Sequence, residues 1–315
     1  MPTKSHHLPQ LEGGLFLTDG GLETCLLFHE GLELPCFAAF DLLKHEAGRR
    51  TLERYFERYI AIARKAGAGF ILESPTWRAS ADWGDRLGYA PAALDRANEA
   101  AIGLMRDLAR RHAASLRAIV VSGCVGPRGD GYIASERMTH LEAEAYHGRQ
   151  IRTFARAGAD MVTAITMTNA NEAVGIARAA RSAGLPIVIS FTLETDGRLP
   201  TGQSLDDAIA EVDWETSRLP AYYMINCAHP THFAAALEEG SAWMTRVRGV
   251  RANASRRSHQ ELNDSPDLDA GDPVELGHEH GELLRRFPRI NVLGGCCGTD
   301  HRHVEAIALA CWQPA

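Results

Sequence analysis

The sequence predicts an α/β protein that folds as a single (β/α)8 barrel of the TIM type. Three observations predict it. Eight short apolar segments rich in β-forming residues recur along the 315 residues. Most of them are continuous apolar runs, as are strands of a parallel sheet that is covered on both faces. The segments between them have the apolar periodicity of amphipathic helices, so strand and helix alternate along the whole chain.

Each expected strand is identified by its apolar run. In chain order these runs are LFLTDGG (15–21), AGFILES (68–74), RAIVVSGCVG (117–126), ADMVTAITM (159–167), LPIVISFTL (185–193), AYYMINCA (221–228), WMTRVRGVRAN (243–253) and INVLGGCCG (290–298). The helices expected between and after them are 49–66, 92–113, 136–157, 170–183, 204–218, 231–239, 274–287 and 300–312. Several end in glycine, as in ARKAGAG, FARAGAD and RSAGLP, which suits the left-handed residue that closes a helix.

Two segments lie outside this alternation. Residues 251–273 are polar and rich in turn residues, and we expect them to form a long loop over the barrel mouth. Residues 1–13 are expected to be an extended N-terminal segment. The prediction is therefore one domain over 1–315.

Composition excludes several classes of partner. The chain has 33 basic and 40 acidic residues, a net charge of −7, and no long block of either sign, which excludes nucleic acid and anionic membranes as expected partners. The N-terminus lacks the apolar core of a signal peptide and no run is long enough to cross a membrane, so a cytoplasmic protein is expected. Seven cysteines, an odd number, favour free thiols or metal ligands over disulfides.

The cysteine pair in NVLGGCCGTD (291–300) lies at the end of the last expected strand. Adjacent side chains of a strand point to opposite faces, but Gly294, Gly295 and Gly298 permit positive φ angles that would turn Cys296 and Cys297 toward one target. Cys227, at the end of another strand, would meet them at the barrel mouth. Three thiolates leave one tetrahedral position open on Zn²⁺, which is typical of a catalytic site.

Other interpretations of these residues carry less weight. Cys124 also ends a strand and is a candidate fourth ligand, and the adjacent cysteines could instead pack in the core or form a vicinal disulfide. The motifs HEH (278–280) and HRH (301–303) are expected to be solvated helix faces and not metal pairs. The three lysines, Lys4, Lys44 and Lys65, lie away from strand ends, which excludes Schiff-base chemistry. No nucleotide-binding motif is present.

DGG (19–21), NC (226–227) and GGCCGT (294–299), in this order, resemble the homocysteine S-methyltransferases. SPTWRAS (74–80), GCVGP (123–127) and ISFTLETDGRLPTG (189–202) support the resemblance, which runs from about residue 14 to 310. It implies a zinc barrel that moves a methyl group from a sulfonium, betaine or methylfolate donor to the thiol of homocysteine, giving methionine. It also implies that Cys227, Cys296 and Cys297 hold Zn²⁺ and that Asp19 contacts the substrate amino group.

The sequence departs from the family at one substrate position. Ile165 stands where the family carries a glutamate that holds the amino-acid end of homocysteine. Either Glu194 or Glu73 replaces that carboxylate, or the accepting thiol is not homocysteine. Trp77 replaces the usual tyrosine and is a candidate wall for a cationic donor. The residues expected to bind substrate are Asp19, Gly20, Thr76, Trp77, Thr166, Glu194 and Asn226.

The expected reaction needs no catalytic side chain beyond the zinc-bound thiolate of the substrate, because Zn²⁺ deprotonates a coordinated thiol. A separate cobalamin or folate domain is not expected, which favours S-methylmethionine, S-adenosylmethionine or a betaine as the donor. Two alternatives stay open. One is a zinc hydrolase that uses zinc-bound water, and the other is a non-catalytic zinc or redox-sensing protein, for which Cys124 would supply a fourth ligand.

Overall fold

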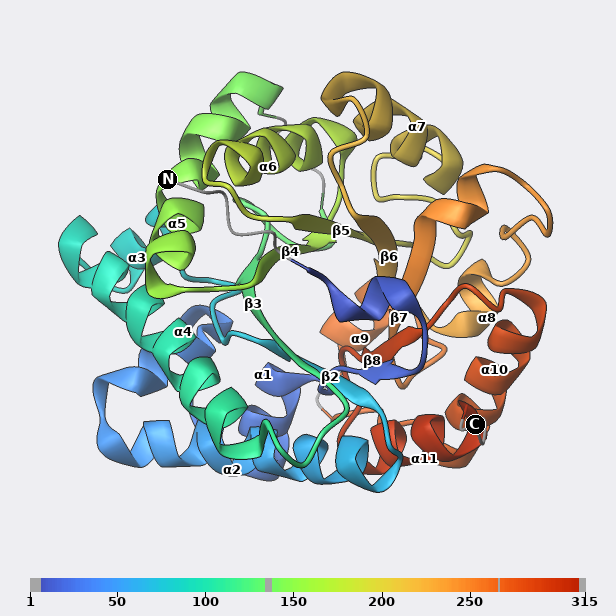
Figure 1. Ribbon diagram of the computed structural model, residues 1–315, viewed down its shortest axis with the longest axis horizontal. Helices are drawn as coiled ribbons and strands as arrows, with labels where there is room; N and C mark the ends of the chain where they lie inside the picture. The colour runs from blue at the N-terminus through green and yellow to red at the C-terminus, as the bar shows by residue number, and fades with distance from the viewer. Residues whose placement is uncertain (1–6, 134–137, 266, 312–315) are drawn as a thin grey trace.

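The structure, a computed structural model, describes residues 7–133, 138–265 and 267–311. Within these residues eight parallel strands close into a barrel in chain order, with the last strand beside the first (Figure 1). The (β/α)8 barrel is thereby confirmed. The strands are β1 Phe16–Leu17, β2 Gly69–Glu73, β3 Ile119–Val125, β4 Met161–Met167, β5 Ile187–Thr192, β6 Tyr222–Asn226, β7 Val247–Ala252 and β8 Val292–Gly295.

The helices surround this barrel and bury their apolar faces against it (Figure 1). The α-helices are α1 Leu22–Thr24, α2 Glu46–Lys65, α3 Ala81–Arg86, α4 Pro91–His112, α5 His140–Ala157, α6 Ala170–Ser182, α7 Leu205–Thr216, α8 Pro230–Phe233, α9 His259–Asn263, α10 Pro273–Arg286 and α11 His301–Cys311. The 3-10 helices are η1 Pro9–Glu12, η3 Pro35–Phe37, η4 Ala39–Lys44 and η5 Trp243–Arg246, and η2 Cys25–His29 is a π-helix. Within the described residues, no helix is both long enough and apolar enough to cross a membrane.

Most expected helices are observed within a few residues of their expected bounds, and two of them, α5 and α8, differ most. Helix α5 begins at His140 and not at 136, because Thr139 and Glu142 form a reciprocal capping box; residues 136 and 137 lie outside the described part of the chain. The helix expected over 231–239 is short, since α8 ends at Phe233 and turns follow it. The final helix ends at Cys311, and residue 312 is likewise outside the described residues.

The amino-terminal end of the barrel is closed. Residues 9–12, expected to be extended, form the 3-10 helix η1; residues 1–6 lie outside the described residues. The Gln10 side chain donates to Tyr222 Oη over 3.3 Å, and Asn291 Nδ2 donates to the Gln10 carbonyl over 2.9 Å. Buried side chains from seven strands, β1 to β6 and β8, pack together above this turn. Ligands are therefore restricted to the carboxyl end.

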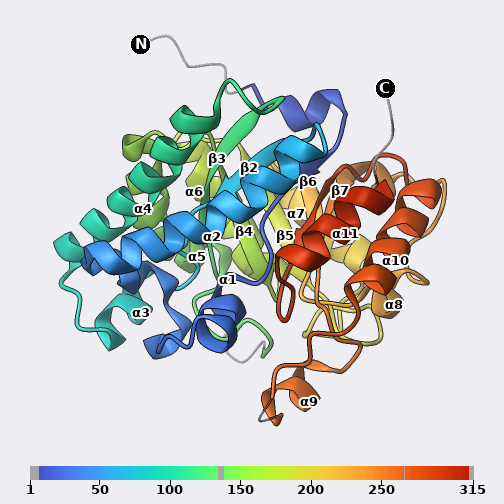
Figure 2. The ribbon, with the colours of Figure 1, turned by 90° about the horizontal axis from the view of Figure 1, so that it is seen from below.

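The carboxyl end of the barrel is open. Helices α1 and α9 lie at this end, and α9 projects beyond the barrel in Figure 2. The predicted long loop at 251–273 contains α9, and several of its residues line a cavity of about 370 Å³ at the ends of the strands. The loop thus forms part of the barrel mouth, as expected. A volume near the lower end of the range for ligand sites favours small ligands.

Candidate metal centre and substrate cavity

Three cysteine thiols converge at the open end of the barrel. Cys227 follows β6, and Cys296 and Cys297 follow β8; their Sγ atoms all lie within 4.8 Å of one another. In the described part of the chain they form the only such group of three or more potential metal-ligating side chains. Cys227 has φ 55°, a left-handed conformation that is uncommon for a residue with a side chain. This sharp turn is what lets a residue at a strand end face the thiols of β8.

The three glycines beside the cysteine pair were all expected to have positive φ angles, but they differ in this respect. Only Gly298 has a positive φ, 78°. A Cβ atom at Gly294 would lie 1.9 Å from Thr18 Oγ1, and one at Gly295 would lie 1.9 Å from Thr299 Oγ1. The prediction of positive φ is therefore wrong for Gly294 and Gly295. These positions need glycine because strands β8 and β1 and the loop after β8 pack too closely for a side chain.

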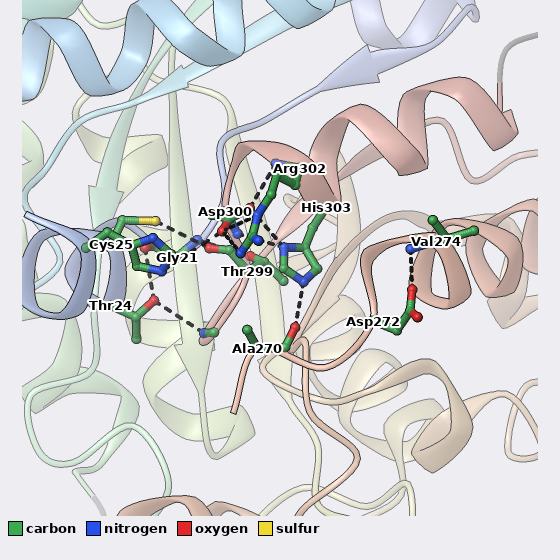
Figure 3. Close-up of polar contacts among 12 residues, drawn as sticks. Gly21, Thr24, Cys25, Ala270, Asp272, Val274, Thr299, Asp300, Arg302 and His303 are labelled. Carbon is green, nitrogen blue, oxygen red and sulfur yellow. Dashed lines mark hydrogen bonds and ion pairs between the residues drawn. The ribbon is translucent and has the colours of Figure 1, made fainter. Parts of the chain in front are cut away.

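The segment after β8 is tied to the first strand end (Figure 3). The Gly21 amide donates to Thr299 Oγ1 over 3.1 Å, and the Gly298 amide donates to Thr24 Oγ1 over 3.3 Å. Cys296 and Cys297 lie directly before these contacts. These hydrogen bonds fix the backbone on the carboxyl side of the two thiols.

Neither histidine motif belongs to the group of potential metal ligands among the described residues. The prediction that both motifs are solvent-exposed is correct for one histidine of each motif and wrong for the other. The first histidine of each motif is exposed, whereas His280 and His303 are fully buried. His280 Nδ1 lies 2.8 Å from the Leu276 carbonyl oxygen. His303 is held by Asp300 and by the Ala270 carbonyl, which ties α11 to the loop after β7 (Figure 3). Helix packing, which sequence periodicity does not resolve, buries these rings.

The surroundings stabilise negative charge on one of the three sulfur atoms, that of Cys297, whereas burial raises the pKa of Cys227 well above its usual value and the net effect of its neighbours and burial raises the pKa of Cys296 to about 12. The Asn226 amide donates to Cys227 Sγ over 3.0 Å, and Tyr132 Oη lies 2.9 Å from Cys297 Sγ and 3.8 Å from Cys227 Sγ. Hydrogen bonds from the Cys227 and Cys296 thiols hold the pKa of Cys297 well below its usual value. Three convergent soft ligands of this kind fit Zn²⁺.

A second layer of polar side chains orients this group. The ring centroids of Tyr132 and His259 are 4.1 Å apart, and His259 Nδ1 lies 3.2 Å from Glu194 Oε1. The other nitrogen of His259 hydrogen-bonds to the Cys227 carbonyl. Sequence analysis missed Tyr132, which lies in a loop, and His259, which begins the short helix α9, because no periodicity or motif distinguishes either residue. Glu194, by contrast, was identified, and its contact is with His259.

The cavity separates the predicted substrate residues into two sets. Asp19, Gly20, Trp77 and Thr166 line it, whereas Thr76, Glu194 and Asn226 do not. Thr76 Oγ1 donates to the Cys124 carbonyl over 2.7 Å, and Asn226 Oδ1 accepts from the Thr166 amide over 3.1 Å. These hydrogen bonds indicate that Thr76 and Asn226 hold the ends of the strands in place and do not contact the substrate directly. Cys124 lines the cavity but lies outside the group of three thiols.

Asp19 is held from both sides. Arg251 Nη2 donates to Asp19 Oδ1 over 2.7 Å, and Tyr55 Oη donates to Asp19 Oδ2 over 3.0 Å. Arg251 is itself only 6% exposed and also donates to the Gly295 carbonyl over 3.0 Å. Sequence analysis missed Arg251, although an arginine near the end of the expected strand 243–253 was a signal that could have been used. Its guanidinium links the ends of β1, β7 and β8.

Glu73 presents an unused carboxylate oxygen at the cavity. The side chain is 5% exposed, and its Oε1 accepts from Thr163 Oγ1 over 2.8 Å. Its Oε2 has no hydrogen-bond partner among the described residues. Burial raises the pKa of Glu73 to about 7. Ile165 lines the same cavity, so a carboxylate on β2 is available where the side chain at 165 offers none.

Trp77 makes a hydrogen bond through its ring nitrogen and a cation–π contact through its ring face. Its Nε1 donates to Thr166 Oγ1 over 3.1 Å, and the Arg78 guanidinium carbon lies 4.0 Å from its ring centroid. An arginine already over this indole weakens the expectation that Trp77 alone forms the wall for a cationic donor. Its neighbour Arg78 also lines the cavity.

Comparisons with known proteins identify one family by sequence and the same barrel fold by structure. The sequence profile of the family described as homocysteine S-methyltransferase matches residues 16–311. Crystal structures of the homocysteine methyltransferase MmuM from Escherichia coli share the fold at low identity. Its oxidised form is 19% identical with a TM-score of 0.73, covering 94% of this chain and 95% of that one. Its metallated form is 18% identical with a TM-score of 0.70, covering 96% and 98%. No curated protein sequence matches the chain.

Proposed function

This chain belongs to the homocysteine S-methyltransferase family, and from that premise we propose that it is a zinc-dependent enzyme acting on a zinc-bound thiol. The proposed reaction moves a methyl group from a small sulfonium or betaine-type donor, with S-methylmethionine or S-adenosylmethionine favoured, to homocysteine, which gives methionine. The observation that carries the proposal is the convergence of three thiols from two separate strands at the mouth of the cavity.

The residues of the chain divide the work of such a reaction. Cys227, Cys296 and Cys297 would hold Zn²⁺, which supplies the acceptor sulfur as a thiolate at neutral pH. The Asn226 side-chain amide donates to Cys227 Sγ, and Tyr132 Oη contacts the Cys227 and Cys297 thiols. The cavity would hold donor and acceptor in line and keep bulk water away. Methyl transfer between them releases no proton, so no general base is needed.

The acceptor would be held by its ammonium group. Asp19 is fixed by Arg251 and Tyr55, and Glu73 adds a carboxylate oxygen that lacks a partner among the described residues. Glu194 is paired with His259 and does not line the cavity. Of the two carboxylates that could replace the one missing at Ile165, these contacts favour Glu73.

Glu73→Gln tests this assignment. We expect it to raise KM for homocysteine about 10- to 100-fold, the cost of losing a hydrogen bond to a charged group. The effect on 4-mercaptobutanoate, which lacks the ammonium group, is expected to be small. The measurement is the steady-state KM of both acceptors for wild type and variant.

Glu194→Gln is the matched comparison, because it makes the same exchange outside the cavity wall. It is expected to change the two acceptors by the same factor. An equal loss with both acceptors in Glu73→Gln, or a homocysteine-specific loss in Glu194→Gln, would contradict the assignment.

The proposed function itself is tested by metal analysis followed by a methyl-transfer assay. The reduced protein is expected to bind about one Zn²⁺ per chain through the three thiols. Incubation with homocysteine and each favoured donor should yield methionine, detected by mass. Zinc-dependent hydrolysis of esters or amides without a donor would support the hydrolase alternative. A zinc site closed by Cys124, without turnover, would support the non-catalytic one.

A further inference from the structure

We propose that Arg78 anchors a carboxylate of the methyl donor, so that the donor is a zwitterion that combines an onium methyl group with a carboxylate. The proposal rests on the proposed function and names its donor class. Arg78 Nη1 donates to the Gly129 carbonyl over 2.7 Å, and its Nε has no hydrogen-bond partner among the described residues. The side chain is 7% exposed and lines the cavity.

The Arg78 guanidinium lies over the rings of two tryptophans. Its central carbon lies 4.0 Å from the ring centroid of Trp77 and 3.7 Å from that of Trp83. Contacts of the guanidinium with ring faces are not hydrogen bonds, so they leave its N–H donors available to a ligand, apart from the Nη1 donor that bonds to the Gly129 carbonyl. A planar carboxylate matches these donors and can accept two parallel hydrogen bonds.

Arg78 lacks the partner that a buried cation normally has. No carboxylate of the described residues forms an ion pair with it. Asp130 is the main acidic influence on it, but Asp130 Oδ1 accepts from the amides of Tyr132 and Ile133. A buried charge without a partner is costly, and an anionic group of a ligand would remove that cost. Burial lowers the pKa of Arg78 to about 10, so the side chain stays charged at neutral pH.

Glu23 offers the complementary charge for the onium end. Glu23 lines the cavity and forms no hydrogen bond or ion pair with another side chain among the described residues, and burial raises the pKa of its carboxyl to about 7. Glu23 is near enough to interact electrostatically with both Arg78 and Cys296. A zwitterion with its carboxylate on Arg78 would therefore place its positive charge beside Glu23, on the side of the thiols.

The transfer step balances without a further reactant. The bond between the methyl carbon and the onium atom of the donor breaks, and its electron pair stays on that sulfur or nitrogen, which becomes neutral. A lone pair of the acceptor thiolate forms the new carbon–sulfur bond. The carboxylate on Arg78 keeps its charge throughout, so this anchor contributes equally to the bound ground state and to the transition state. Its loss should therefore raise KM and leave kcat nearly unchanged.

The test compares donors with and without the carboxylate. The probes are S-methylmethionine against (3-aminopropyl)dimethylsulfonium, and glycine betaine against tetramethylammonium. In wild type the carboxylated member of each pair is expected to have about 10- to 100-fold higher kcat/KM, as for a charge-assisted bidentate contact. Arg78→Gln should abolish this preference through KM, and Arg78→Lys should restore part of it.

Arg86→Gln is the matched control. The Arg86 guanidinium also stacks on Trp83, at 4.4 Å, but Arg86 is exposed and does not line the cavity. The donor preference of this variant should equal that of wild type. If Arg78→Gln lowers turnover of both members of a pair equally, Arg78 only supports the indoles and the proposal is overturned.

Calorimetric binding of glycine betaine and tetramethylammonium to the zinc-loaded protein separates the two proposals. If no donor is turned over, the proposed function fails, yet tighter binding of glycine betaine that Arg78→Lys weakens would still support the anchor. Equal binding of both probes to wild type would overturn the anchor while leaving methyl transfer intact. Should Arg78→Gln fail to fold, the wild-type and Arg78→Lys comparisons still decide the outcome.

Discussion

Cys297→Ser is expected to lower bound zinc from about one ion per chain to a small fraction, because the site retains only two of its three thiolate ligands. Methyl transfer should fall about 1,000-fold or more. An unbound alkyl thiol is only a few per cent ionised near neutral pH, and the acceptor would also lose its fixed position. The measurements are metal content after dialysis and the initial rate of methionine formation. Cys227→Ser and Cys296→Ser should behave in the same way.

Cys124→Ala provides the internal control for zinc content. Cys124 lies in the same cavity wall but outside the group of three thiols, so the variant is expected to keep its zinc. If both single variants, Cys124→Ala and Cys297→Ser, lost their zinc, the metal site would be one closed by four thiols. Full zinc content in Cys297→Ser would exclude this group as the metal centre.

Arg251→Met is expected to lower the free energy of unfolding by about 3–5 kcal/mol, because it leaves the buried Asp19 carboxylate without its cationic partner. Arg251 is 6% exposed and its Nη2 lies 2.7 Å from Asp19 Oδ1, so water cannot easily replace it. The measurement is urea-induced unfolding at neutral pH. The double variant Asp19→Asn, Arg251→Met should recover much of the loss, since neither charge then remains buried alone.

Arg149→Met is the matched control for this ion pair. Arg149 Nη2 lies 2.9 Å from Asp95 Oδ2, but the arginine side chain is 51% exposed. Exposed pairs contribute about 1 kcal/mol or less, so the variant should unfold almost like wild type. A loss in Arg251→Met no larger than that in Arg149→Met would show that Asp19 does not depend on Arg251.

Together these variants separate the two functions of the barrel mouth. The thiols of β6 and β8 are expected to hold the metal, whereas Arg251 holds the strand ends that place Asp19 at the cavity. Glu73 and Arg78 then lie in the wall with hydrogen-bonding atoms that have no partner among the described residues. Unused polar atoms at a buried cavity are where substrate groups are expected to bind, because burial without a partner is costly.

The sequence by itself determined the barrel and the three thiols. Apolar strands alternating with amphipathic helices leave few topologies, and a parallel barrel brings every strand end to one mouth. Cys227 and the pair Cys296–Cys297 could therefore be placed together from their positions after apolar runs. The structure confirms that placement for the sulfur atoms.

Only the tertiary structure decided which side chains surround those thiols. The contact of Tyr132 with Cys297 and the pairing of Arg251 with Asp19 join segments far apart in the chain. The packing of other segments around Glu73 likewise decides that its Oε2 has no partner among the described residues. The burial of His280 and His303 and the tight packing at Gly294 have the same origin. Sequence patterns report the period and the face of an element. The direction of a side chain and the path of a loop depend on contacts with segments that no local pattern describes.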